Sequence, residues 1–127
     1  MRTYLIEPQL LFVPYLSRVL ADAGLQIVAT KDDVDVKDIA AHDPAAIFVD
    51  VDFFERGAPN AICRIRQVAK NAAVIAFSDS EDTTFEASCY ISGANAVVSK
   101  RAGIDAALKS VRALVPGPSL RPRSATV

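Results

Sequence analysis

The chain has little of the chemistry that builds metal and redox sites. Its 127 residues include one histidine, two cysteines and no tryptophan. Cys63 and Cys89 lie in apolar segments without a CxxC spacing or a histidine cluster beside them. We therefore expect reduced core thiols in a cytoplasmic protein, with no metal or redox role for either cysteine.

The chain also lacks an excess of charge and a long hydrophobic run. Its 14 basic and 15 acidic residues give a formal charge of −1, which offers no attractive field to nucleic acid or an anionic membrane. We find no basic-then-apolar leader and no apolar span of membrane length, so neither export nor membrane insertion is expected. The length fits one domain that buries a single core without a metal or a disulfide framework.

The most informative stretch covers residues 44–53, an apolar run with β-branched and aromatic members that reaches two carboxylates, Asp50 and Asp52. Such a run predicts a strand buried on both faces, which is typical of a parallel sheet. In open parallel sheets, ligands bind beyond the carboxyl ends of the strands. Asp50 is therefore a candidate functional carboxylate, although solvation of a strand end or a turn cap explains both acids as well.

Strands and helices are predicted to alternate along the whole chain. Besides the central strand, apolar runs predict strands at residues 2–6, 25–29, 72–77 and 94–98. Helical spacing predicts a first helix at residues 10–23, a second that ends near His42 and a fourth that ends at about Ser92. The third helix has a core stripe of Ala61, Ile62, Ile65 and Val68, and the fifth has apolar residues Ile104, Leu108, Val111 and Leu114 at helical spacing. Right-handed crossovers then give an α/β, doubly wound, flavodoxin-like sheet of five parallel strands in the order 2-1-3-4-5.

Two parts of this pattern carry expectations about exposure. On the third helix, Arg64, Arg66 and Lys70 are expected to point outward. Residues 116–127 contain prolines, two arginines and no periodicity, which predicts a disordered tail or the start of a linker after a domain at residues 1–115.

Polar residues follow four of the predicted strands: Glu7, Asp50, Ser78 and Lys100. In the predicted strand order these residues converge on one crevice, although they lie far apart in the sequence. A carboxylate that accepts a phosphoryl group needs a divalent cation held by acids, a hydroxyl and an ammonium group, and the chain supplies most of that set. Ser78 with Glu81 also matches the spacing of a helix capping box, which is a purely structural alternative.

The motifs around these residues resemble the receiver domain of two-component response regulators over about residues 2–115. Ile47-Phe-Val-Asp50 resembles the phosphoacceptor strand, residues 74–78 resemble the strand that ends in the family's hydroxyl residue, and residues 93–100 resemble the segment that ends in its lysine. Residues 7–12 resemble the opening of the nitrate-regulator (NarL/LuxR-type) subfamily. Members of that subfamily usually carry a DNA-binding helix-turn-helix after the receiver.

The resemblance implies a role for each matching residue. Asp50 would accept phosphate from a histidine kinase, Ser78 would sense the phosphoryl group, and Lys100 would pair with it. Glu7, Asp50 and Asp52 would contribute to a Mg²⁺ site. Whether Lys100 pairs with Asp50 or with Asp79 at rest is left open by the sequence.

The sequence departs from the family pattern at several positions. Pro8 stands where the family has its second acid, a direct Mg²⁺ ligand, so Mg²⁺ binding is expected to be weakened. Asp79 replaces a small residue after the hydroxyl position, Val97 replaces the switch aromatic, and Phe54 stands where a proline is usual.

These departures favour an atypical receiver that is not an enzyme and works as a protein-interaction or dimerisation module. The expected surfaces are the helix 4, strand 5 and helix 5 face or the helix 1 and helix 5 face, and the partner is a histidine kinase or another signalling protein. One alternative is slow phosphorylation of Asp50 that controls a DNA-binding output domain. Another is binding of a nucleotide second messenger by Arg121 and Arg123.

Overall fold

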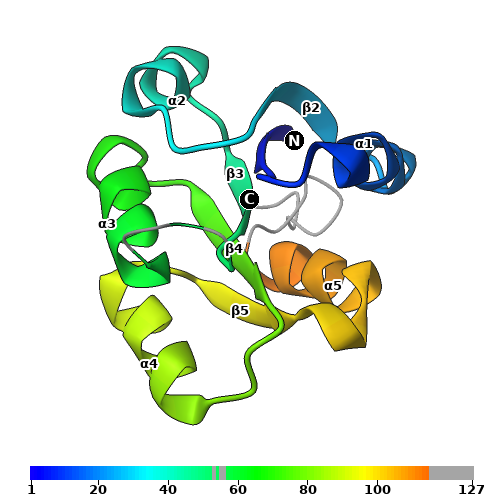
Figure 1. Cartoon of the computed structure of the whole chain (residues 1–127). Helices are drawn as coiled ribbons and strands as arrows, with labels where there is room; N and C mark the ends of the chain where they lie inside the picture. Colours follow the sequence, from blue (N-terminus) through cyan, green and yellow to red (C-terminus); the bar gives the residue numbers. More distant parts are fainter. Residues whose placement is uncertain (53, 55–56, 115–127) are drawn as a thin grey trace, which may run out of the picture.

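In the described part of the chain, five parallel strands form one sheet in the order β2-β1-β3-β4-β5. The computed structural model describes residues 1–52, 54 and 57–114. The strands are β1 (Arg2–Ile6), β2 (Gln26–Lys31), β3 (Ala46–Asp50), β4 (Ala73–Ser78) and β5 (Ala96–Ser99). The predicted fold class and strand order are confirmed (Figure 1).

Helices cover both faces of the sheet (Figure 1). One core cluster joins the sheet to α2 (Val36–His42), α3 (Ala58–Val68) and α4 (Thr83–Ser92) through Ile39, Ile62 and Cys89. The other joins it to α1 (Val13–Asp22) and α5 (Ile104–Leu114) through Leu20 and Val111. Two short 3₁₀ helices, η1 (Leu10–Phe12) and η2 (Lys100–Ala102), follow the carboxyl ends of β1 and β5.

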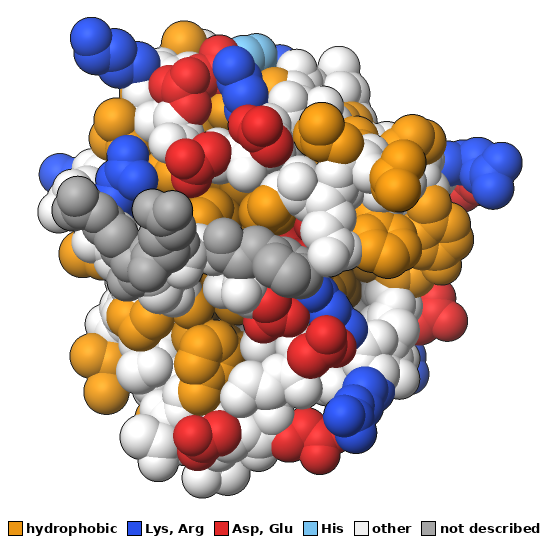
Figure 2. Space-filling model, viewed as in Figure 1, with side chains coloured by type: hydrophobic (Ala, Val, Ile, Leu, Met, Phe, Trp, Pro, Cys, Tyr) orange, Lys and Arg blue, Asp and Glu red, His pale blue; other side chains and the backbone are white. Residues whose placement is uncertain are grey.

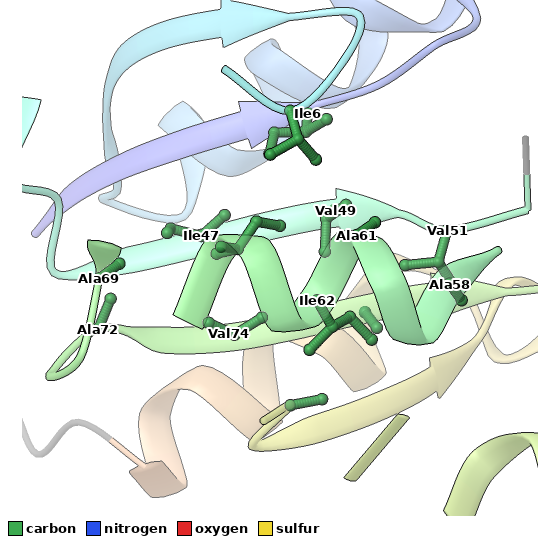
Figure 3. Close-up of a cluster of buried hydrophobic side chains, with 14 of the residues drawn as sticks. Ile6, Ile47, Val49, Val51, Ala58, Ala61, Ile62, Ala69, Ala72 and Val74 are labelled. Carbon is green, nitrogen blue, oxygen red and sulfur yellow. The ribbon is translucent and has the colours of Figure 1, made fainter. Parts of the chain in front are cut away.

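The central strand β3 is buried along its whole length because it has packed helices on both sides. Its side chains alternate between the two faces, as the pleat of a strand requires. Ile47 and Val49 belong to the cluster under α2, α3 and α4, whereas Phe48 belongs to the cluster under α1 and α5. Figure 3 shows Ile47 and Val49 beside Ala61 and Ile62 of α3. Burial of each such aliphatic side chain stabilises the fold by about 1.5–3 kcal/mol.

The register of the sheet brings the polar strand ends to one edge. Ile6 of β1 pairs with Val49 of β3, so Glu7 and Asp50 follow at the same level. Asp50 pairs with Phe77 of β4, and Ser78 pairs with Ser99 of β5, the residue before Lys100. The sheet therefore aligns four polar residues that the sequence places up to about ninety positions apart.

The first helix differs from the sequence expectation at its beginning. Residues 10–12 form the 3₁₀ turn η1, and the α-helix begins only at Val13, with Pro14 in its first turn. Proline is favoured there because its missing N–H has no intrahelical partner to lose. Across the change from 3₁₀ to α geometry the helical spacing no longer selects a single face. Leu11 and Tyr15, two of the apolar residues whose helical spacing predicts this helix, are 94% and 53% exposed.

The third helix also corrects three expectations. Ala58, Ala61, Ile62 and Ile65 form its buried stripe, and Cys63 lies outside this stripe and is exposed instead of being a core thiol. Val68, the last residue of α3, is 36% exposed, because the buried stripe ends at Ile65. Arg66 is not an outward charge, because its guanidinium reaches around the end of the helix. It donates hydrogen bonds to the carbonyl oxygens of Ala69, Lys70, Ala72 and Gly93 and to the side chain of Asn95.

No helix in the described ranges is long and apolar enough to cross a bilayer.

Candidate functional site

The polar side chains buried within the described residues belong to Thr3, Glu7, Asp50 and Ser78. The last three lie at or just beyond the carboxyl ends of β1, β3 and β4. Burial of a polar group destabilises a protein unless hydrogen bonds or an opposite charge replace the lost water. The contacts of these residues therefore define the site.

Lys100 supplies the positive charge of the site. Its ammonium nitrogen lies 2.8 Å from an Asp50 carboxylate oxygen and 2.8 Å from an Asp52 carboxylate oxygen. Burial lowers the pKa of this ammonium group, but the hydrogen bonds with Asp50 and Asp52 outweigh it and raise the pKa above its ordinary value. The sequence left open whether Lys100 pairs with Asp50 or with Asp79. In the structure Lys100 pairs with Asp50, and Asp52 is its second partner.

Asp52 extends across the strand ends. Its Oδ1 accepts a hydrogen bond from the Ser78 hydroxyl at 2.6 Å, and its Oδ2 accepts one from the backbone N–H of Asp79 at 2.9 Å. Desolvation by burial raises the pKa of this carboxyl, but hydrogen bonds from Lys100, Ser78 and the Asp79 N–H lower it below the ordinary range. The ionised form of Asp52 is therefore the form that this environment favours.

The surroundings of Glu7 shift its pKa in the opposite direction. Its side chain accepts the backbone N–H of Gln9 at 3.0 Å, and the residue is only 3% exposed. Desolvation by burial, followed by a hydrogen bond and charge repulsion with Asp50, raises the pKa of Glu7 to about 7, against the lowering effects of the Gln9 N–H and Lys100. Near neutral pH, Glu7 is therefore protonated for part of the time.

The donor set does not fit a Mg²⁺ ion in this arrangement. Mg²⁺ prefers ionised carboxylates and other oxygens in an octahedral shell. Pro8 offers no side-chain oxygen, Glu7 tends toward its neutral form, and Asp50 and Asp52 both face the ammonium of Lys100. Among the residues that the structure describes, no group of three or more acid, histidine or cysteine side chains is placed to hold a metal. The ammonium group of Lys100 lies between the Asp50 and Asp52 carboxylates.

A cleft of about 250 Å³ opens beside these charges. Its polar side consists of Glu7, Asp50 and Lys100, and its apolar side includes Phe12, Tyr15, Leu16, Phe77 and Ile104. In Figure 2, hydrophobic side chains gather over the α1 side of the molecule. In the sequence, the helical spacing of Tyr15 and Leu16 predicts the helix that forms this wall.

The capping-box alternative for Ser78 is not what the structure contains. The N-cap of α4 is Asp82, whose side chain accepts the N–H of Thr84 at 2.9 Å. Ser78 instead donates its hydroxyl proton to Asp52 and accepts the N–H of Ser80 at 3.0 Å. The geometry thus places all the predicted site residues, Glu7, Asp50, Asp52, Ser78 and Lys100, in one connected group.

Comparisons with known proteins agree with this arrangement of strands. No family model and no curated protein matches the sequence. Solved structures do match in fold. A DNA-binding response regulator of the LuxR family from Staphylococcus aureus has 16% identity over 89% of this chain and 97% of that chain, with a TM-score of 0.78.

Two further solved structures also match in fold at low sequence identity. The CheX–CheY–BeF₃–Mg²⁺ complex from Borrelia burgdorferi has 19% identity over 90% of this chain and 88% of that chain, with a TM-score of 0.80. The signal receiver domain of the response regulator NarL from Mycobacterium tuberculosis has 20% identity over 87% and 95%, with a TM-score of 0.73. The chain therefore has the fold of a response regulator receiver domain, which confirms the resemblance that its motifs predicted.

Proposed function

We propose that this chain is an atypical receiver domain, which carries a signal by contact with other proteins and does not depend on Mg²⁺ for its resting state. The observation that carries this proposal is the position of Lys100, whose ammonium group bridges Asp50 and Asp52 at 2.8 Å each. An ammonium group held by two carboxylates already neutralises much of the charge that a dication would neutralise. Pro8 also stands where the family has its second acid, a direct Mg²⁺ ligand.

The surface offers apolar side chains for such contacts. Within the described residues, Leu10, Leu11, Phe12 and Tyr15 are all more than half exposed and follow one another on η1 and α1. Apolar groups that cluster on a surface are common at protein interfaces. A smaller pair, Tyr90 and Ile91, is exposed on α4. We infer that the η1–α1 patch, defined by Leu10, Leu11, Phe12 and Tyr15, is the main contact surface of a homodimer or a signalling partner such as a histidine kinase.

Two features set the context of this proposal. The matched Borrelia burgdorferi structure contains CheY in complex with CheX, so protein contact is an established use of this fold. Cys63 and Cys89 are both unbridged, and Cys63 is exposed, which favours a reducing compartment such as the cytoplasm.

We propose residues 1–115 as the receiver unit. Residues 116–127, with Arg121 and Arg123, lie outside the described residues, and we propose no ligand for these arginines.

A matched pair of surface variants tests the contact surface. We expect the wild-type protein to dimerise in a concentration-dependent way by light scattering after size exclusion. Leu11→Lys, at a residue that is 94% exposed, should weaken the dimer at least about tenfold, because a charge would be buried at the interface. Ile91→Lys, at a residue that is 86% exposed on α4, is the control and should leave the dimer unchanged. A reversed result would move the interface to the α4 face, and a wild type that stays monomeric would contradict dimerisation.

A second candidate function is a phosphate switch at Asp50. The observation that favours it is the cleft of about 250 Å³ beside Asp50, Glu7 and Lys100, through which a phosphodonor could reach the carboxylate. A titration with beryllofluoride and Mg²⁺, followed by amide NMR on the wild type and Asp50→Asn, tests it. Saturable shifts at Ser78 and Lys100 that vanish in Asp50→Asn would support the switch and a downstream output. The first proposal predicts no saturation at millimolar Mg²⁺.

A further inference from the structure

The carboxylate of Asp52 is held by donors from the ends of two neighbouring strands. Within the described residues, it accepts the hydroxyl of Ser78 at 2.6 Å, the backbone N–H of Asp79 at 2.9 Å and the ammonium of Lys100 at 2.8 Å. Ser78 ends β4, Asp79 follows it, and Lys100 follows β5. One side chain from the segment after β3 thus ties the ends of β4 and β5 to that segment.

These donors are of the kinds that proteins use to bind oxyanions. A hydroxyl, a backbone N–H and an ammonium group, all aimed at one place, bind and stabilise the oxygens of a phosphate or a carboxylate. The same ammonium group also contacts Asp50 at 2.8 Å, so this place lies directly beside the candidate phosphoacceptor. The carboxylate that occupies it belongs to the chain itself.

The Ser78 hydroxyl and the Asp79 N–H are both already used in hydrogen bonds to Asp52. The Ser78 hydroxyl and the Asp79 N–H each have a single proton, and both protons are donated to Asp52. A second anion beside Asp50 cannot receive these two hydrogen bonds while Asp52 keeps them. The negative charge of Asp52 would also repel that anion at short range.

The geometry points to a masked anion-binding site, in which the Ser78 hydroxyl, the Asp79 N–H and Lys100 form a seat for a tetrahedral oxyanion and the Asp52 carboxylate fills it. Asp52 then makes the contacts that an external phosphate would make, so the strand ends are held together without a phosphate. This inference rests on the proposed function, because it explains how a receiver can signal by contact without a phosphorylation step. The backbone N–H of Asp52 also donates to Asp50 at 3.2 Å, which keeps the two acids side by side.

Removal of the internal carboxylate should open the seat. Inorganic phosphate is titrated at pH 7 and constant ionic strength into the wild type and Asp52→Ala, and the amide resonances of residues 78 and 79 are followed by NMR. We expect saturable shifts in Asp52→Ala with an affinity at least about tenfold tighter than in the wild type. Equal affinity, or no binding by a folded Asp52→Ala, would overturn the inference.

Two controls separate the seat from a general charge effect. Asp79→Ala removes a neighbouring negative charge but keeps both Asp52 and the backbone N–H at position 79, so it should gain no phosphate binding. The double variant Asp52→Ala, Ser78→Ala lacks one donor and should lose most of the gain. If Asp79→Ala bound phosphate as well as Asp52→Ala does, bulk charge would be the cause and the inference would fail.

A milder variant covers the possibility that Asp52→Ala does not fold. Asp52→Asn keeps the shape and one oxygen acceptor but loses the charge. We expect its Asp79 amide resonance to move upfield from the wild-type position, because hydrogen bonds to charged acceptors are stronger. An unchanged Asp79 amide would contradict the contact with Asp52. Light scattering on the same samples reports the dimer separately, so failure of the anion seat and failure of the contact surface are distinguished.

Discussion

Glu7 and Asp52 are two acids of one site whose surroundings push their titrations apart. Asp52 receives hydrogen bonds from three groups within the described residues, which lower its pKa. Glu7 is more deeply buried and lies against another acid, which raises its pKa to about 7. Hydrogen-bond donors favour the ionised form of an acid, whereas burial and a neighbouring negative charge favour the neutral form. At the residue scale, the site is therefore a set of unequal acids around one lysine.

This inequality predicts how stability depends on pH. The folded protein holds the Glu7 proton up to a pH of about 7, whereas the unfolded chain loses it near 4.5. Between these values the folded state binds more protons, so the Glu7 contribution to the free energy of unfolding falls as pH rises. Glu7→Gln resembles the protonated form and should lack this loss. Relative to the wild type, the variant should gain on the order of 2–3 kcal/mol between pH 4 and pH 8.

Urea unfolding of both proteins across this pH range measures the effect. Glu81→Gln is the matched control, because the Glu81 side chain is 64% exposed and, among the described residues, forms only a surface ion pair with Arg101. The stability difference between the control and the wild type should change little with pH. If Glu7→Gln and the wild type kept a constant difference, Glu7 would titrate in the same way in the folded and unfolded states.

At the edge of the sheet opposite the site, Arg66 joins the segments that precede β4 and β5. Its guanidinium links the end of α3 to Gly93, which terminates α4, and to Asn95 before β5. The Asn95 side chain also accepts the backbone N–H of Val74 in β4 at 2.9 Å. This arrangement satisfies carbonyl groups at helix ends that would otherwise lack partners. At the element scale, one arginine sets how α3, α4 and the sheet meet.

Substitution of the glycine at this junction should therefore be costly. Gly93 has φ of 125°, and a Cβ there would lie 3.0 Å from the Cβ and Cγ atoms of Arg66. Gly93→Ala combines an unfavourable backbone conformation with a displaced Arg66, and we expect a loss of about 2–3 kcal/mol. Gly24→Ala is the matched control, because Gly24 has φ of 93° and nothing within 4 Å of its added Cβ. Its expected loss is about 1 kcal/mol.

Both losses can be read from chemical denaturation midpoints. The difference between the two variants isolates the contact with Arg66, since each carries a similar backbone penalty. Equal losses would mean that Arg66 adjusts without losing its hydrogen bonds, and the junction would then be looser than its distances indicate.

At the scale of the whole molecule, the two core clusters and the site depend on residues up to the end of α5. Val111 of α5 is buried in the cluster with Leu20 of α1 and Phe48 of β3. We expect a protein that ends at residue 115 to unfold with the same free energy as the full chain, within about 0.5 kcal/mol. Thermal and urea unfolding of the two proteins check this boundary. A larger loss on removal of residues 116–127 would place them in the cooperative unit.

Much of this architecture could be predicted from the sequence, because it depends on patterns with a fixed period. Apolar runs such as residues 46–50 identify buried strands, and the alternation with helices allows few topologies. The convergence of Glu7, Asp50, Ser78 and Lys100 follows from that topology alone. The exposure of Leu11 and Cys63 could not be predicted in this way, because local helix geometry decides which face a residue joins.

The sequence by itself determined the strand order and the edge at which the polar residues meet. Only the tertiary structure decided how those residues pair. Lys100 contacts Asp50 and Asp52 together, Ser78 donates to Asp52, and Arg66 turns inward to the end of α4. The physical reason is that period and hydrophobicity act along the chain, whereas hydrogen bonds and ion pairs require segments far apart in sequence to be positioned to within a few tenths of an ångström.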